Sequence, residues 1–233
     1  MLSPEKYQHL FFDLDHTLWD FEANSAQTMF LLYEHFQLKE KNIDKSVFQK
    51  RYSYHNFTLW AQLEKGLVTR AEVRVNRFLF TLQEFGINDF ELAKNMSDVY
   101  VKILPTQTLL FDGAMELIQH VHPKYQLHII TNGFVEVQYK KLANCGLDKF
   151  FTKIITSEEA EANKPEKKIF DFAFKLSGAN ASNSLMIGDN PFADMQGALN
   201  AGMDRVLFNT MQYQHDVPIT LEIKSLKELM QWL

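Results

Sequence analysis

The sequence predicts an α/β protein, with a parallel β-sheet core into which an all-helical segment is inserted. Two observations support this prediction. Short apolar runs alternate with helical patterns in the second half of the chain, as in sheets whose strands are joined by crossover helices. An earlier interval, from about residue 21 to 104, has helical periodicity and no strand pattern of comparable quality. We therefore predict a discontinuous core of residues 1–19 and 105–233, and a helical domain of residues 20–104.

Four apolar runs are predicted as the strands of the sheet. Each is short and leads into small or polar residues, as expected for strands that helices cover on both faces. The runs are Gln8–Leu14, Gln126–Thr131, Ser184–Ile187 and Arg205–Phe208. Helical patterns between the later runs predict crossover helices at Asp112–Val121, Phe134–Cys145 and Glu166–Leu176.

Side-chain spacing and capping residues predict several helices in the inserted segment. Ala26, Met29, Phe30 and Tyr33 recur at helical spacing. Thr69 and Glu72 fit a capping box, in which the hydroxyl caps the first turn and the carboxylate bonds back to the backbone. Pro105 then ends the last helix, because proline disfavours helix in the residue before it.

Composition narrows the class of protein. The 233 residues are 46% hydrophobic and include 20 Phe, which predicts a sizeable core. The formal charge of −5 argues against a nucleic-acid polymer as partner but allows a small phosphorylated ligand. The single cysteine, Cys145, fits a reducing compartment, and neither a signal peptide nor a membrane span is visible, so we expect a cytoplasmic protein. The oligomeric state is not predicted.

Two carboxylates stand at the end of the first predicted strand. Asp13 and Asp15 are two residues apart, so their side chains point to one side if the strand continues. Ligands of open α/β sheets bind beyond this end of the strands. An isolated Asp-x-Asp is usually a solvated turn, and the interpretation as a site depends on the segments that follow the other strands.

Three further segments supply such residues. Thr131, Asn132 and Gly133 end the second predicted strand and precede a helix, whose unpaired N–H groups attract anions. Lys164 precedes another helix; Lys167 and Lys168 compete with it as phosphate ligands, but their positions inside that helix predict a solvated face. The third strand leads into Gly188 and Asp189, with Asp194 about one helical turn later.

These residues together have the chemistry of a metal and phosphate site. Mg²⁺ prefers hard oxygen ligands in octahedral geometry, which acids, water and a phosphate oxygen would supply. The metal and Lys164 would keep Asp13 ionised and able to act as a nucleophile. Nucleotide-cofactor motifs are absent: Gly197 to Gly202 resembles a P-loop, but Met203 and Asp204 stand where Lys and Ser or Thr are needed.

In this order, the residues resemble the four signature motifs of the haloacid dehalogenase superfamily. Asp13-Leu-Asp15-His-Thr17 resembles the first motif, Thr131 the second, Lys164 the third, and Gly188-Asp189 followed by Asp194 the fourth. The resemblance covers the whole chain, because this superfamily places a helical type 1 cap domain where the insertion occurs. It implies a Rossmann-like, three-layer parallel sheet core with this cap.

The resemblance also implies the role of each residue. Asp13 would attack phosphorus, while Asp15 would protonate the leaving oxygen and then activate water. One Mg²⁺ would be held by Asp13, the backbone carbonyl of Asp15 and the carboxylate of Asp189. The phosphate oxygens would be held by Thr131, Asn132, Gly133 and Lys164. Thr17 would support the loop, and Asp194 would orient Lys164 or a metal-bound water.

Asp15 favours a phosphoester hydrolase within this superfamily, because haloacid dehalogenases lack this second acid. A phosphonate hydrolase would need a cap lysine, and nothing marks Lys50 or Lys65 for that task. Several local strings resemble pyrimidine 5′-nucleotidases: Leu59-Trp60 followed by Gly66–Thr69, then Ile129–Phe134, and Ile169–Asp171. The expected substrate is therefore a pyrimidine nucleoside 5′-monophosphate. The alternatives are a sugar-phosphate phosphatase, a phosphoglucomutase-like transferase and a catalytically idle binding protein.

The cap is expected to recognise the leaving group. Trp19 and Trp60 are candidates for stacking on a base, and Asn24, Asn56 or Gln62 for hydrogen bonds to its edge. The alternative is that both tryptophans pack within the helical cap, and for Trp60 this interpretation is at least as good.

Overall fold

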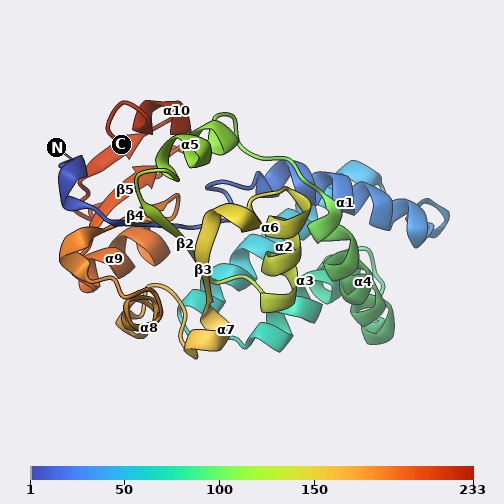
Figure 1. Ribbon diagram of the computed structural model, residues 1–233. Helices are drawn as coiled ribbons and strands as arrows, with labels where there is room; N and C mark the ends of the chain where they lie inside the picture. Colours follow the sequence, from blue (N-terminus) through green and yellow to red (C-terminus); the bar gives the residue numbers. More distant parts are fainter. Residues whose placement is uncertain (1) are drawn as a thin grey trace. The chain divides into compact units, whose positions relative to one another are not determined.

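The computed structural model describes residues 2–233 and divides the chain into two compact units (Figure 1). The core unit comprises the residues up to Phe21 together with Thr108–Leu233, and the helical unit comprises Glu22–Gln107. The sequence placed the insertion at residues 20–104, so the boundaries differ by two residues at one end and three at the other. No helix among the described residues has an apolar stretch long enough to cross a membrane.

A six-stranded parallel sheet forms the centre of the core unit, as predicted for an α/β fold. The strands are ordered β3-β2-β1-β4-β5-β6. Their bounds are β1 His9–Phe12, β2 Gln126–Thr131, β3 Phe151–Thr156, β4 Ser184–Gly188, β5 Asp204–Phe208 and β6 Leu221–Ile223. Four of them match predicted runs, whereas the edge strands β3 and β6 were not predicted.

The position of β1 determines where a ligand can bind. This buried strand lies between β2 and β4, so the chain builds the sheet outward from it in both directions. Its register pairs Phe12 with Ile129 of β2 and with Ile187 of β4. The three strands therefore end at nearly the same level. The crevice at such a reversal of strand order is where open α/β sheets bind ligands.

Helices cover both faces of the sheet and complete a three-layer core. In Figure 1, α5 and α10 lie on one side of the sheet and α8 and α9 on the other. On the second side, Phe170 packs with Phe11 and Met186 of the sheet in one buried cluster. The helices are α5 Ala114–Val121, α6 Val135–Asn144, α7 Ser157–Ala160, α8 Lys167–Ser177, α9 Gly197–Asn200 and α10 Leu226–Leu229, with a π-helix at Pro191–Gln196.

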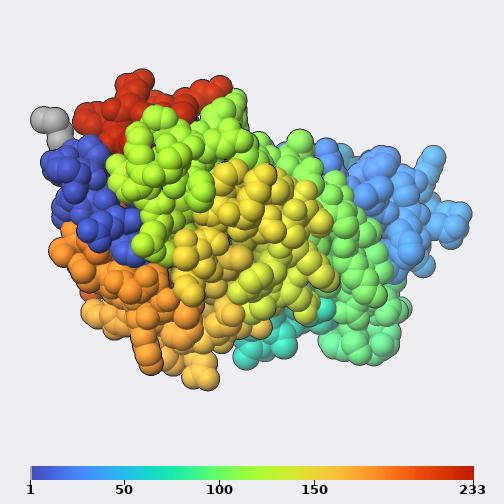
Figure 2. Space-filling model, viewed as in Figure 1, coloured from blue at the N-terminus to red at the C-terminus, as the bar shows by residue number. Residues whose placement is uncertain are grey.

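The C-terminal segment closes one side of the core unit. Helix α10 packs beside α5, and the red and yellow-green segments meet at the upper edge of Figure 2. The Lys227 ammonium bonds both oxygens of Asp112 at 2.9 Å. This exposed pair contributes little stability by itself, and the buried side chains of Leu226 and Leu229 are the main anchor of α10.

The helical unit is a bundle of four helices with an aromatic core of its own. Tyr52 packs against Phe78 in a tilted arrangement with ring centroids 4.9 Å apart, and both rings contact Tyr100. The predicted capping box of Thr69 and Glu72 is present at the start of α3. The helices are α1 Phe21–His35, α2 Lys45–Glu64, α3 Arg70–Glu84 and α4 Phe90–Ile103.

The two connections to the helical unit run side by side where they leave the core. Trp19 and Leu110 form an antiparallel bridge. On either side of it, the Asp20 amide donates to the Leu109 carbonyl at 3.1 Å and the Phe111 amide to the Leu18 carbonyl at 2.9 Å. The outgoing and returning chain are thus tied together within the core unit.

A buried histidine pair in the sheet predicts acid sensitivity. His128 is fully buried, and its Nε2 atom lies 3.0 Å from Nδ1 of His9 on the neighbouring strand. Burial, with smaller contributions from His9 and Lys153, lowers the pKa of His128 to about 4. Between pH 4 and the ordinary histidine pKa of about 6.5, the unfolded chain therefore binds a proton that the folded chain does not.

Stability should consequently be complete above about pH 6.5 and decrease as the pH falls towards 4. When the pH falls from 7.5 to 5.0, protonation of His128 in the unfolded chain should lower the free energy of unfolding by about 2 kcal/mol. Urea unfolding of the wild type and of His128→Leu at both pH values measures this difference. The pH dependence should shrink in His128→Leu and persist in His120→Gln, which changes an exposed histidine. An unchanged pH dependence in His128→Leu would contradict this assignment.

Candidate active site

Asp13 follows β1 directly and lies at the carboxyl edge of the sheet. Its amide donates to the Ile187 carbonyl of β4 at 2.9 Å, which continues the ladder by one residue and fixes the position of its backbone. The side chain is 7% exposed. A nearly buried carboxylate is costly unless cations or hydrogen-bond donors surround it, and both are present.

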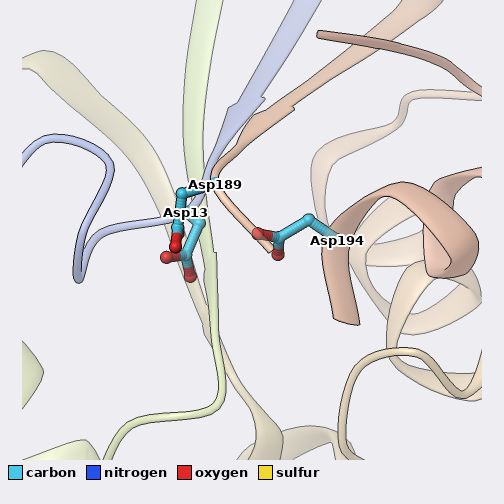
Figure 3. Close-up of side chains that lie close together, drawn as sticks. All are labelled: Asp13, Asp189 and Asp194. Carbon is cyan, nitrogen blue, oxygen red and sulfur yellow. The ribbon is translucent and has the colours of Figure 1, made fainter. Parts of the chain in front are cut away.

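Three carboxylates converge at this edge. One carboxylate oxygen from each of Asp13, Asp189 and Asp194 lies within 4.8 Å of the other two, and Figure 3 shows the three side chains at this edge. Asp189 follows β4 directly, and Asp194 comes from the π-helix at Pro191–Gln196. Glycine is needed at position 188, because a side chain there would collide with the Asp194 carboxylate. The Asp194 Oδ2 atom accepts from the Asn190 amide at 3.0 Å, which fixes its orientation.

Lys164 is the cation of this cluster. Its buried ammonium donates to Asp13 at 2.5 Å, to Asp194 at 2.6 Å and to the Ile130 carbonyl at 2.9 Å. Burial lowers the pKa of Lys164, but the charges of Asp13 and Asp194 outweigh it and raise the pKa above its ordinary value. The competing lysines face solvent, where Lys167 pairs with Asp171.

The loop after β2 holds the lysine segment in place. The Asn132 side chain accepts from the Lys164 amide at 2.8 Å and donates to the Lys164 carbonyl at 3.1 Å. The Thr131 hydroxyl oxygen accepts from the Gly133 amide at 3.1 Å and from the Gln138 amide group at 2.8 Å. Both acceptor positions of this oxygen are thus used, and its O–H remains available to donate.

The Asp15 side chain does not belong to the three-acid cluster. Its two oxygens accept instead from α6: Oδ1 from the Lys141 ammonium at 2.5 Å, and Oδ2 from Gln138 at 2.8 Å. Neither α6 residue was singled out from the sequence. A signal existed, however, because Lys141 occurs on the buried face of α6 with Val137 and Leu142, where a solvated lysine is not expected.

Two further residues of the loop after β1, Thr17 and Trp19, have clear positions. The Thr17 hydroxyl donates to Asp189 at 3.1 Å, and so links the loop after β1 to the acid cluster. Trp19 is fully buried in the core unit, with the Lys141 ammonium 4.1 Å from the centre of its ring. Such burial favours a packing role for Trp19, because a ring with no exposed surface offers no face to a ligand, and its part in stacking on a base stays a prediction.

The remaining specificity candidates lie in the helical unit. Asn24 is fully buried, and Asn56 is nearly buried and accepts from the Arg77 guanidinium at 3.0 Å. Trp60 is partly buried and packs against Leu59, Leu63 and Val73, as the packing interpretation expected. Their part in substrate recognition stays a prediction.

The cluster has the donor set and the charge of a cation site. It combines three carboxylates with one ammonium, so its net charge is negative when all groups are ionised. Burial raises the pKa of Asp13 well above its usual range against the attraction of Lys164, and burial and Asp194 raise the pKa of Asp189. A divalent cation would relieve this repulsion, and carboxylate oxygens are the ligands that Mg²⁺ prefers.

A parallel α/β core with an inserted helical unit, and with acids at the ends of its central strands, defines the structural class. The chain belongs to the haloacid dehalogenase-like hydrolase family, whose family model matches residues 10–208.

Curated relatives cover nearly the whole chain. YfnB of Bacillus subtilis, which carries the name of a HAD-hydrolase, is 35% identical over 97% of this chain and 94% of its own. Its crystal structure, bound to magnesium, has a TM-score of 0.87 and covers 97% of this chain and 98% of that one. Two relatives named pyrimidine 5′-nucleotidase are each 30% identical: PynA of Streptococcus pneumoniae, over 97% of this chain and 95% of its own, and YjjG of Escherichia coli, over 98% of both.

Proposed function

We propose that the protein is a Mg²⁺-dependent phosphatase that hydrolyses pyrimidine nucleoside 5′-monophosphates through a phosphorylated Asp13. The observation that carries the proposal is the buried Lys164 ammonium, which bonds both Asp13 and Asp194 beside Asp189. A nucleophilic carboxylate needs this combination, because positive charge must hold it ionised and must also bind the phosphate that it attacks. The nucleotide substrate is proposed from the likeness to PynA and YjjG.

In the first step, an Asp13 oxygen attacks phosphorus and the bond from phosphorus to the leaving oxygen breaks. Asp15 gives its proton to that oxygen, so that the nucleoside leaves as an alcohol. The Thr131 hydroxyl donates to a phosphate oxygen, since its acceptor positions are already used by Gly133 and Gln138. Lys164 binds a second phosphate oxygen while it keeps its bond to Asp194.

In the second step, water attacks the phosphorus of the aspartyl-phosphate. Asp15, now ionised, accepts the proton of that water, and the bond between phosphorus and Asp13 breaks to release inorganic phosphate. Asp13 is thereby regenerated. Asp189, Asp13 and the backbone carbonyl of Asp15 are the proposed ligands of Mg²⁺, which when bound would neutralise phosphate charge during both steps. The crystal structure of YfnB with magnesium supports this choice of ion.

Asp189→Ala tests the metal assignment. Loss of this carboxylate should raise the Mg²⁺ concentration required for half-maximal activity by at least roughly 10- to 100-fold, because that is the usual cost of losing a residue that only supports a metal ligand and Asp189 is a direct ligand in the proposal. Activity titrations with Mg²⁺ measure the shift, and calorimetric titration of Mg²⁺ without substrate measures binding directly. Asp171→Ala, an exposed acid of α8, is the control. An unchanged Mg²⁺ requirement in Asp189→Ala would remove it from the ligand set.

A substrate panel tests the nucleotide assignment. We would compare kcat/KM for UMP, dUMP, dTMP, AMP and hexose phosphates, with p-nitrophenyl phosphate as a general phosphatase substrate. A pyrimidine monophosphate should have the highest value. A hexose phosphate in first place would replace the nucleotidase proposal by the sugar-phosphatase alternative, and no turnover of any ester would favour the idle binding protein.

Substitutions in the helical unit test the proposed cap role. Trp60→Leu and Asn56→Ala should change the relative rates across this panel while the chemistry continues. Because Asn56 is also the acceptor for buried Arg77, its replacement needs an accompanying measurement of stability.

A further inference from the structure

The loop after β1 presents Asp15 to α6. Within the loop, the amides of Leu18 and Trp19 donate to the Leu14 carbonyl at 3.0 and 2.9 Å, and the His16 amide donates to the Trp19 carbonyl at 3.0 Å. The turn is therefore closed by its own backbone bonds. His16 has a positive φ of 62°, which is uncommon for a residue with a side chain and shows how tightly the turn is wound. The Asp15 backbone is fixed, but these bonds leave its side-chain direction open.

Lys141 supplies a buried cation for that side chain. The residue is 2% exposed, and its ammonium lies 2.5 Å from Asp15 Oδ1 and 4.1 Å from the ring centre of Trp19. A desolvated ammonium is costly unless a carboxylate or an aromatic face compensates it, and here both do. A surface lysine would contribute far less to the position of a partner, because water competes for both groups.

Gln138 fixes the other oxygen of Asp15 and connects it to the phosphate loop. Its Nε2 atom donates to Asp15 Oδ2 and to the Thr131 hydroxyl, both at 2.8 Å. Gln138 and Lys141 are three residues apart, so they point from the same face of α6. Gly133 has to be a glycine for this arrangement, since a side chain there would collide with Gln138.

We propose that Lys141 and Gln138 are positioning residues, which set the location of the Asp15 carboxyl group for both proton transfers. The inference rests on the proposed phosphatase function, in which Asp15 serves as the acid and then as the base. It adds a site on α6 that aligns proton transfer without touching the phosphate: Lys141 acts through Asp15, and Gln138 acts through Asp15 and Thr131.

This role predicts a dependence on the leaving group. Expulsion of a nucleoside requires a proton from Asp15, because an alkoxide is a poor leaving group. Expulsion of p-nitrophenolate requires none, so Asp13 can be phosphorylated by p-nitrophenyl phosphate even when Asp15 is misplaced. The second step always needs Asp15 to accept a proton from water. A misplaced Asp15 should therefore let the phosphorylated enzyme accumulate with p-nitrophenyl phosphate.

The experiment compares Lys141→Met, which removes the charge at similar length, with Lys141→Arg, which keeps it. Lys140→Met is the matched control, an exposed lysine one position earlier on α6. Gln138→Leu tests the second contact. Rapid mixing with p-nitrophenyl phosphate measures the burst of p-nitrophenol and the steady rate that follows, and single-turnover reactions with UMP measure phosphorylation by a nucleotide. Intact mass after acid quench detects the phosphoryl adduct.

For Lys141→Met we expect a burst close to one equivalent per active site, a steady rate lowered about 100-fold or more, and a similar loss in single turnover of UMP. Lys141→Arg should recover much of the loss, and Lys140→Met should match the wild type. Unchanged steady rates in Lys141→Met, or the absence of a burst in that folded variant with equal losses for both esters, would overturn the inference. Wild-type protein without phosphatase activity would instead refute the proposed function, and the inference with it.

Discussion

Asp13→Asn is expected to lose at least about 10⁴-fold in kcat/KM for every phosphate ester, because the amide cannot form the aspartyl-phosphate. The fold should survive, since the substitution removes one of three crowded carboxylates and leaves Lys164 bonded to Asp194. Turnover of p-nitrophenyl phosphate with added Mg²⁺ measures the loss. Intact mass after acid quench should show a phosphoryl adduct in the wild type and none in the variant.

Asp112→Asn provides the control, because this exposed acid pairs only with Lys227 among the ion pairs of the described residues and lies outside the acid cluster. Circular dichroism and urea unfolding would verify that Asp13→Asn is folded. Substantial retained turnover, measured on fresh protein, would contradict the assignment of Asp13 as the nucleophile.

Lys164→Met is expected to cost about 3–5 kcal/mol of unfolding free energy at pH 8, because it leaves Asp13 and Asp194 buried beside each other without their cation. Activity should be lost as well, since the phosphate loses its ammonium ligand. Urea unfolding without added Mg²⁺ measures the stability change, and Lys167→Met is the matched control on the same segment. Its exposed pair with Asp171 should contribute no more than about 0.5 kcal/mol.

A double-mutant cycle separates the charge effect from the loss of packing. Asp194→Asn removes one of the two acids, so it should destabilise the protein less in the Lys164→Met background than in the wild type, or should stabilise it. Additive effects of the two substitutions, or a cost below about 1 kcal/mol for Lys164→Met, would mean that Lys164 does not compensate the buried acids.

Strands at the centre of the sheet could be predicted from the sequence, and strands at its edges could not. β1, β2 and β4 are nearly continuous apolar runs, because helices cover them on both faces. β3 lies at one edge of the sheet and is less uniformly buried, with an exposed threonine and a partly buried lysine. β6 is three residues long and forms the other edge. Edge strands bury less surface, so their apolar signal is weaker.

The acids and Lys164 could be singled out because each follows a strand or precedes a helix, and parallel strands end at one edge. No local sequence pattern indicates which lysine pairs with which acid. That Lys164 bonds Asp13 and Asp194 while Lys141 bonds Asp15 depends on where α6 packs against the loop after β1. Asp194 was assigned to orient Lys164 or a metal-bound water; the structure shows its bond to Lys164, and its oxygens also lie within reach of a shared ion.

Trp19 shows why the role of an aromatic residue near a motif acid could not be assigned from the sequence. An indole near a motif acid is equally suited to a ligand and to a core, and the deciding fact is whether any of its surface is open. Here the ring is buried and faces the Lys141 ammonium. Its partner was not apparent because Lys141 is far along the chain.

The bridge between Trp19 and Leu110 should allow the inserted helices to be removed or exchanged without disturbing the sheet. The outgoing and returning backbones are hydrogen-bonded to each other as two antiparallel strands. The insertion is therefore connected to the core unit in the way that a turn is connected to the two strands of a hairpin. A short turn could replace the helical unit without a change in the register of β1. Exchange of the whole bundle for one from another relative would therefore test whether the helical unit selects the ester, as proposed.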